Sequence, residues 1–236
     1  MPGRRGMFIT FEGSDGSGKS TQARLLAHSL RRAGHDVVET REPGGSPRAE
    51  AIRALLLSGK AARLGALAET VLFNAARADH LRVTIRPSLA RGAIVICDRF
   101  ADSTRAYQGV LGKMDDDLLV AAEAAVVGDT APDLTIILDL PAELTLERLG
   151  ARRETVGEAA DKFEEEALAH HDALRQAFLD IAALAPARCV VVSAQAPVEE
   201  VAKRIFALVM DRVSPEAGRS APRPAKNTDG RPKRQR

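Results

Sequence analysis

The sequence contains few cysteines and few aromatic residues. Its 236 residues include two cysteines, seven phenylalanines, one tyrosine and no tryptophan. Cys97 and Cys189 each lie in a β-branched stretch, so we expect two small buried residues, no disulfide framework and a cytoplasmic, reducing location. Because aromatic residues make up only 3% of the chain, any aromatic side chain inside a motif is a candidate for a specific role.

Long apolar runs are also absent. The longest, at 93–97 and 136–138, have the length of buried strands, whereas a membrane-spanning helix needs about 20 apolar residues. Residues 1–6 are basic but lead directly into a strand-like run, so they are not expected to form a signal peptide. The sequence therefore predicts no association with a membrane.

The net charge of +2 is unevenly distributed. Residues 214–236 hold seven lysines and arginines against two acidic residues, so their charge of +5 leaves the first 213 residues at −3. This distribution argues against binding of nucleic acid by the folded part. We expect one domain over residues 1–213 and a basic, disordered tail over 214–236. The tail is interpreted as a solvated extension, with binding of an acidic partner as the alternative.

Apolar runs alternate with helical patterns along the chain. Strands are expected at 7–11, 37–40, 93–97, 134–138 and 189–192, and helices at 19–33, 47–57, 67–89, 115–127, 142–153, 162–184 and 198–212. This alternation predicts an α/β fold, in which a five-stranded parallel sheet has helices on both faces. Such sheets bind ligands at the carboxyl ends of their strands.

The most specific motif follows the first expected strand. Residues 13–20 read GSDGSGKS and match G-x-x-x-x-G-K-S/T between a strand and a helix. In such a loop backbone N–H groups surround phosphate oxygens, the lysine reaches the β- and γ-phosphates, and the last hydroxyl binds Mg²⁺. A glycine turn with an accidental lysine is the alternative. The motif predicts an ATP site formed by Gly13, Ser14, Asp15, Gly16, Ser17, Gly18, Lys19, Ser20 and Thr21.

A second cluster, DRFADSTRAYQ at 98–108, begins at the end of the third expected strand. Asp98 follows four apolar residues and is a candidate to hold Mg²⁺ with Ser20, while Asp139 is a rival with a structural role as its alternative. Arg99 is expected in the same crevice, either paired with a carboxylate or binding an anion. The cluster favours recognition of a small polar ring compound together with an anion, through Arg99, Ser103, Thr104, Tyr107 and Gln108.

Four segments together resemble the bacterial thymidylate kinases of the P-loop nucleoside monophosphate kinase superfamily. They read FEGSDGSGKST at 11–21, TREPGG at 40–45, LFNAAR at 72–77 and DRF…AYQ at 98–108, in that family's order and spacing. The resemblance covers about residues 7–212. It implies a three-layer P-loop kinase fold, ATP-dependent phosphorylation of dTMP to dTDP in dTTP biosynthesis, Mg²⁺ as cofactor, and a homodimer.

The resemblance also implies how the nucleoside is held. Phe73 matches the ring that stacks on thymine, although a core position in a long helix is its alternative. Arg77 matches the donor to a thymine carbonyl, and Ser103 and Thr104 fall where the family contacts the edge of the base. Tyr107 falls where a ring lies against the sugar and disfavours a 2′-hydroxyl.

Three further residues match positions that contact the phosphate or the sugar of the acceptor. Arg99 matches the arginine that grips the 5′-phosphate of the acceptor, with Arg41 a weaker candidate for the same role. Asp15 matches the carboxylate near the 3′-hydroxyl. The nucleophile would be a phosphate oxygen that is already ionised at neutral pH, because the second pKa of a phosphate lies near 6, so no general base is required.

The remaining predicted part is a lid at about residues 148–164. Gly16 and Ser17 stand where one branch of the family carries a catalytic arginine, so this chain resembles the branch that supplies the arginine from the lid. Lys162 replaces an arginine that is frequent in the lid, which leaves open which lid cation touches the transferred phosphoryl group. The candidates are Arg148, Arg152 and Arg153.

Two other functions remain open at this point. One is a P-loop kinase for another nucleotide or for a deoxynucleoside, which the dependence on an acceptor phosphate would distinguish. The other is a nucleotide-switched binding protein that acts through its basic tail. A GTPase is disfavoured, because the sequence has no Asn-Lys-x-Asp segment for reading guanine.

Overall fold

Five short apolar strands form one parallel sheet in the computed structural model, which describes residues 5–156 and 164–213. The strands lie in the order β2-β3-β1-β4-β5. Their central members are buried along nearly their whole length, as expected for parallel strands covered on both faces. They are β1 (Phe8–Glu12), β2 (Val37–Arg41), β3 (Ile94–Asp98), β4 (Leu134–Asp139) and β5 (Cys189–Ser193). The predicted five-stranded sheet is confirmed.

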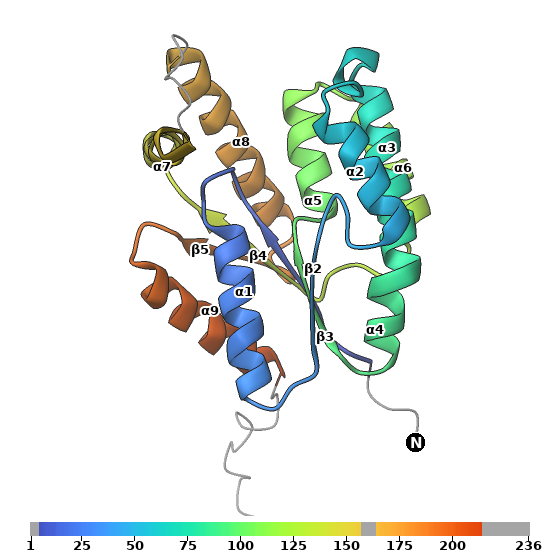
Figure 1. Ribbon diagram of the computed structural model, residues 1–236, viewed down its shortest axis with the longest axis vertical. Coiled ribbons are helices and arrows are strands. Elements are labelled where there is room, and N and C mark those ends of the chain that lie inside the picture. The colour runs from blue at the N-terminus through green and yellow to red at the C-terminus, as the bar shows by residue number, and fades with distance from the viewer. Residues whose placement is uncertain (1–4, 157–163, 214–236) are drawn as a thin grey trace, which may run out of the picture.

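Helices α1 (Lys19–Arg32) and α9 (Val198–Val213) cover one face of the sheet (Figure 1). Alternate residues of the strands, such as Phe11 and Ile96, pack there in one cluster with Leu26 of α1 and Ile205 of α9. Because α1 packs on this face, its first residue lies close to the end of β1, and the loop 13–18 joins the two.

The opposite face carries the other large helices, so the molecule has three layers (Figure 1). A π-helical turn (Leu81–Ile85) and α4 (Arg86–Ala90) pack on Phe8 and Val95, while α8 (Glu164–Leu184) packs Phe178 near Ile137. Further elements are α2 (Pro47–Leu57), a 3₁₀ turn (Ala62–Leu64), α3 (Ala66–His80), α6 (Asp116–Val127) and α7 (Ala142–Val156). Helices α2 and α3 stand beside the carboxyl ends of β2 and β3.

Two predictions of helices differ from the structure. The helix expected over 67–89 is divided into α3, the π-helical turn and α4, where Pro87 occupies one of the first positions because it needs no N–H partner there. A helical segment that the pattern did not predict follows β3. It consists of α5 (Ala101–Thr104) and a π-helical stretch (Arg105–Leu111), and it holds most of the second motif. Such π-helical turns are frequent at functional sites.

The predicted lid falls on the end of α7 and the start of α8. Its middle, together with residues 214–236, lies outside the described residues. Both cysteines are buried and free, as predicted. None of the described helices is long and apolar enough to cross a membrane.

Candidate active site

The loop between β1 and α1 has the geometry of a phosphate site. Gly13 has a φ of 130°, and a Cβ there would lie 2.5 Å from the carbonyl oxygen of Leu138, so only glycine fits. Gly18 caps α1, and within the described chain no side chain caps its first N–H groups. They are therefore available to an anion, which the helix dipole also favours.

Lys19 is the first residue of α1 and is buried beneath this loop. Its ammonium group donates a hydrogen bond of 2.6 Å to the carbonyl oxygen of Ser14. Burial, reinforced by the charge of Arg99, lowers the pKa of Lys19 to about 8, although Asp15 and Asp98 oppose the shift. The phosphates of a nucleotide would supply the negative charge that the buried ammonium group requires.

Ser20 and Asp98 meet at the carboxyl end of β3, as the sequence predicts for a magnesium site. The Ser20 hydroxyl donates to Oδ2 of Asp98, while the buried Oδ1 has no hydrogen-bond partner among the described residues. A hydroxyl and a carboxylate are hard oxygen ligands, which Mg²⁺ combines with phosphate oxygens, so the two residues fit this ion. The rival Asp139 binds Arg175 through both carboxylate oxygens, at 2.6 and 3.1 Å, and this supports its structural interpretation.

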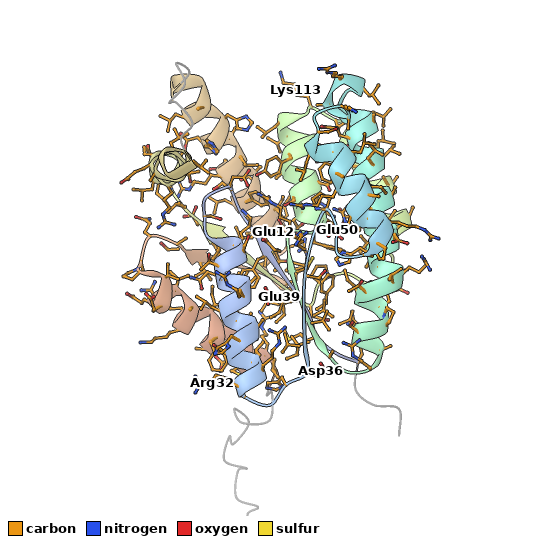
Figure 2. The ribbon with its side chains drawn as sticks, in the orientation of Figure 1. Glu12, Arg32, Asp36, Glu39, Glu50 and Lys113 are labelled. Carbon is orange, nitrogen blue, oxygen red and sulfur yellow. The ribbon has the colours of Figure 1, made fainter. Side chains whose placement is uncertain are left out.

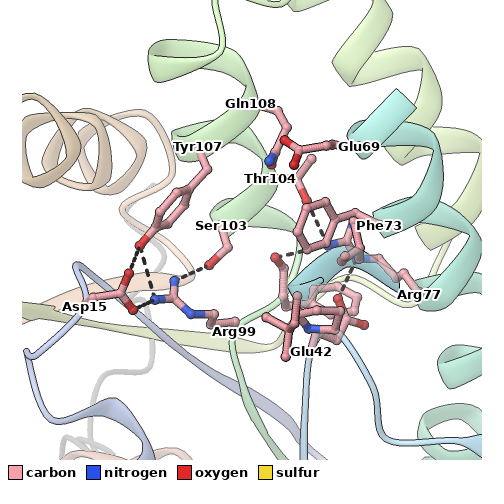
Figure 3. A pocket seen from close by; sticks show the side chains of 14 residues that line it. Asp15, Glu42, Glu69, Phe73, Arg77, Arg99, Ser103, Thr104, Tyr107 and Gln108 are labelled. Carbon is pink, nitrogen blue, oxygen red and sulfur yellow. Dashed lines mark hydrogen bonds and ion pairs between the residues drawn. The ribbon is translucent and has the colours of Figure 1, made fainter. Parts of the chain in front are cut away.

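A cavity of about 270 Å³ opens beside this loop, between α3 and the segment that follows β3 (Figure 3). Figure 3 shows Asp15, Arg99 and Tyr107 on one side of it and Phe73 and Arg77 on the other. Its walls include Glu42, Pro43, Leu56, Leu57, Glu69, Phe100, Ser103, Thr104 and Gln108. Half-buried Phe73 faces the cavity instead of the main core clusters, which favours the stacking role over the core role.

Arg77 is held rigidly at the base of this cavity. Its guanidinium group donates to Glu42 at 2.8 Å, to the hydroxyl of Thr104 at 2.9 Å, to the carbonyl oxygen of Phe100 at 3.2 Å and to the side chain of Asn74 at 3.3 Å. Among the described residues, these bonds use four of the five N–H groups of an arginine. The remaining N–H, on the nitrogen that faces Asn74, has no hydrogen-bond partner within the part of the chain that the structure describes.

Glu42, at the end of the second strand, connects Arg77 to a buried histidine. Its carboxylate also contacts Nδ1 of His80 at 3.0 Å, and Nε2 of this ring lies 2.7 Å from the hydroxyl of Thr40. Both His80 and Glu42 are buried. The network fixes the position of Arg77 from below, which leaves it little freedom to turn away from a ligand.

Arg99 lies where the cavity meets the phosphate loop. Its guanidinium group donates to Asp15 at 2.5 Å, to the hydroxyl of Ser103 at 3.1 Å and to the hydroxyl of Tyr107 at 3.2 Å. Burial acts to raise the pKa of Asp15, but the charges of Arg99 and Lys19 outweigh it, so this pKa is lowered. Arg99 is therefore paired with a carboxylate, which is one interpretation of the sequence. It also lines the cavity, as the other interpretation, binding of an anion, requires.

The cavity and the phosphate-loop pocket share two residues. A pocket of about 300 Å³ is lined by Gly16, Gly18, Lys19, Ser20, Thr21, Asp98, Arg148 and Leu149, and by Asp15 and Arg99, which also line the first cavity. A ligand in one pocket would therefore meet a ligand in the other beside one carboxylate and one guanidinium group.

Helix α7, which contains the start of the predicted lid, reaches this boundary. A Cβ at Gly16 would lie 3.4 Å from the carbonyl oxygen of Thr145 and from Leu149, so α7 packs directly on the loop. Arg148 lines the phosphate-loop pocket and donates to the carbonyl oxygen of Ala194 at 3.0 Å. The side chains of Arg152 and Arg153, and the whole of Lys162, lie outside the described residues.

Arg41 does not line this cavity. Its guanidinium group binds Glu50 at 3.2 Å and lines a separate pocket together with Arg24 and Arg53. The physical reason is the alternation of side chains along a strand: Arg41 and Glu42 leave the end of β2 in different directions, and it is Glu42 that enters the cavity.

The sequence reasoning missed Glu12, Glu42 and Glu69. Glu42 and Glu69 line the cavity, and Glu12 binds the backbone N–H of Phe100 and the hydroxyl of Ser103. A signal was present for two of them, because Glu12 ends the first strand and Glu42 follows the second. The rule that singled out Asp98, a carboxylate at the carboxyl end of a parallel strand, applies equally to both.

Comparison with known proteins gives one consistent result. A sequence model of the family described as thymidylate kinase matches residues 11–205. A thymidylate kinase of Nitrobacter hamburgensis is 54% identical over 209 residues, which cover 89% of this chain and 90% of that protein. One of Caulobacter vibrioides is also 54% identical over 209 residues, with 89% and 98% covered.

A solved structure shares the fold. The crystal structure of thymidylate kinase from Ehrlichia chaffeensis matches with a TM-score of 0.71 and 36% sequence identity. The match covers 87% of this chain and 99% of the other. The similarity confirms the predicted P-loop kinase fold, a parallel sheet between layers of helices.

Proposed function

The chain belongs to the thymidylate kinase family and phosphorylates dTMP to dTDP with ATP, and we propose that this transfer takes place where its two pockets meet, at Asp15 and Arg99. The observation that carries the proposal is the sharing of these two residues by the phosphate-loop pocket and the neighbouring cavity. ATP would occupy the first pocket and dTMP the second. This arrangement would bring the γ-phosphoryl group and the acceptor phosphate together in line.

In the proposed complex the residues of the cavity read the thymidine moiety. Phe73 stacks on the base, and Arg77 offers its remaining N–H to a carbonyl oxygen of thymine. Ser103, Thr104 and Gln108 lie along the base edge, and the ring of Tyr107, fixed by hydrogen bonds to Arg99 and Asp15, faces the sugar.

The residues where the two pockets meet bind the negatively charged phosphate groups. An oxygen of the dTMP phosphate attacks the γ-phosphorus atom, and the bond from that atom to the oxygen bridging to the β-phosphate breaks, so that ADP leaves. Arg99 holds the acceptor phosphate, Lys19 binds the β- and γ-phosphates, and Arg148 is the described lid residue placed to approach the transferred group. Removal of water from the closed pocket would strengthen each of these contacts.

We assign Ser20 and Asp98 as the residues that hold Mg²⁺, because one oxygen of Asp98 is buried without a partner in the described chain. When bound, the ion would neutralise charge on the β- and γ-phosphates. We also propose a cytoplasmic location, because Cys97 and Cys189 are free and buried, as is usual in a reducing compartment.

We also propose that the enzyme is a homodimer, formed through the outer surface of α3, α6 and the adjacent π-helical stretch. Helices α3 and α6 contact each other, and apolar side chains that are 44–59% exposed gather on these elements: Leu67, Val71, Val110, Leu118 and Val120. Exposed apolar surface of this kind favours protein association. Sedimentation velocity would show a dimer, whereas a monomer at micromolar concentration would contradict the proposal.

An acceptor panel tests the function directly. Release of ADP should be fast with dTMP, slower with dCMP and UMP, and negligible with thymidine, which offers Arg99 no phosphate. Efficient phosphorylation of thymidine would identify a deoxynucleoside kinase instead. Hydrolysis of ATP that does not depend on any acceptor would favour a nucleotide-switched binding protein.

A further inference from the structure

Glu12 is a fully buried carboxylate at the end of β1, next to the phosphate loop but outside both pockets. Figure 2 labels it near the centre of the molecule. Its two oxygens accept hydrogen bonds from different groups of the segment after β3, one from the backbone N–H of Phe100 at 2.7 Å and one from the hydroxyl of Ser103 at 2.6 Å. Glu12 thus ties the end of β1 to the start of α5.

The residue directly before this contact has an unusual backbone. Arg99 has a φ of 69°, in the left-handed region that residues other than glycine rarely adopt. Its N–H donates to the carbonyl oxygen of Phe11 at 2.9 Å, and the next N–H, of Phe100, donates to Glu12. Two consecutive residues of β1 therefore hold the backbone on both sides of the strained Arg99.

A second connection reaches the side chain. The hydroxyl of Ser103 donates to Glu12 and accepts from the guanidinium group of Arg99 at 3.1 Å. The other terminal nitrogen of this guanidinium group donates to Asp15 and to the hydroxyl of Tyr107. Glu12 therefore determines where Ser103 sits, and Ser103 holds one terminal nitrogen of Arg99.

We propose that Glu12 is a positioning residue, which holds the backbone and side chain of Arg99 in the orientation that binds the acceptor phosphate. The inference rests on the proposed phosphate-binding role of Arg99. Burial, and to a lesser extent the charge of Asp102, raises the pKa of Glu12 to about 7. A neutral residue would be easier to bury, so a carboxylate here fits a position that serves the site at the expense of stability.

Calorimetric binding of dTMP and of thymidine tests the proposal. Glu12→Gln should weaken dTMP binding about fivefold or more, because a charge-assisted contact loses its alignment, and should change thymidine binding by less than about twofold. In an Arg99→Ala background the same substitution should have no further effect on dTMP. A role that is only structural would weaken both ligands equally and would persist without Arg99, and this result would overturn the proposal.

Asp102→Asn serves as the matched control. Like Glu12→Gln, this substitution removes a buried carboxylate. Asp102 lies in α5, however, and its carboxylate binds Arg188 at 2.6 and 2.8 Å. We expect it to lower the melting temperature while preserving the ratio of dTMP to thymidine affinity. Loss of this ratio in Asp102→Asn would overturn the proposal, because any disturbance of α5 would then produce the effect.

Further measurements distinguish a failure of Glu12→Gln to fold, a failure of the proposed role of Arg99 and a failure of the proposed role of Glu12. If Glu12→Gln does not fold, Glu12→Asp, which keeps the charge but shortens the side chain, should show the same selective loss for dTMP, and equal losses for both ligands would overturn the proposal. If Arg99→Ala itself binds dTMP as tightly as the wild type, the assigned role of Arg99 fails and the inference fails with it. If Arg99→Ala is impaired and Glu12→Gln is not, only the inference fails.

Discussion

Lys19 is almost fully buried in the free protein, and burial, more than the charge of Arg99, lowers its pKa to about 8. A lysine with this pKa is partly neutral in mildly alkaline solution. Bound phosphate groups favour the charged form and should return the pKa towards its ordinary value.

ATP binding at about pH 8 should therefore be accompanied by the uptake of a fraction of a proton. The γ-phosphate is already ionised at this pH, so the proton goes to Lys19. Calorimetric titrations in two buffers with different ionisation enthalpies would measure the uptake. Lys19→Arg is the control, because a guanidinium group remains charged; an uptake equal to that of the wild type in this variant would refute the assignment.

The positions of single site residues were predictable to different degrees. Phe73, Arg77, Arg99 and Tyr107 belong to motifs, and the structure brings all four to one cavity. Arg41 is also a motif residue, but it pairs with Glu50 outside this cavity. A motif fixes the residue type and its place in the chain, whereas the direction of a side chain at a strand end depends on strand register, which is a property of the folded sheet.

The junction of β1 and α5 joins two elements that are nearly ninety residues apart in the chain, and the sequence alone did not show it. The pattern of 101–111 has no clear apolar stripe, because several buried positions of this segment hold polar residues: Asp102, Thr104 and Gln108. Polar residues that line a site interrupt the periodicity on which the prediction of a helix depends. The strands and the long amphipathic helices have no such conflict, and their positions were predicted within a few residues.

The same junction should give stability a specific pH dependence. The pKa of Glu12 is raised from 4.5 to about 7 in the folded protein, so the folded state binds a proton more tightly than the unfolded chain. Its contribution to the free energy of unfolding is fully present below about pH 4.5 and is lost as the pH rises through about 7.

Wild-type protein should therefore lose about 1 to 3 kcal/mol relative to Glu12→Gln between about pH 5 and about pH 8. Urea denaturation at several pH values measures this difference. The test compares how the free energy of unfolding of each protein changes with pH, so a difference between the two proteins that is constant with pH does not affect it. Parallel curves would show that Glu12 does not titrate in this range.

All described residues of the proposed site lie between Glu12 and Leu149, and the last described helix, α9, ends at Val213. Deletion of residues 214–236 should consequently leave kcat, and KM for ATP and dTMP, unchanged within error. Steady-state kinetics of the truncated enzyme at physiological salt would measure this. A tenfold or greater fall in kcat/KM would place the tail in the active site.

Across the whole molecule, three layers of structure bring the nucleotide loop of β1 and α1 against a cavity built from α3 and α5. The two pockets meet at Asp15 and Arg99. If the phosphoryl group is transferred there, Arg99 must act on the acceptor phosphate. Lys19 and the backbone of the loop would hold ATP largely without it.

The most direct test is the kinetics of Arg99→Ala. We expect kcat/KM for dTMP to fall about ten- to two-hundredfold, the equivalent of about 1.5–3 kcal/mol for a charge-assisted contact, with a much smaller change in KM for ATP. An Arg99→Ala enzyme that uses dTMP as well as the wild type does would contradict the proposed meeting of the two substrates.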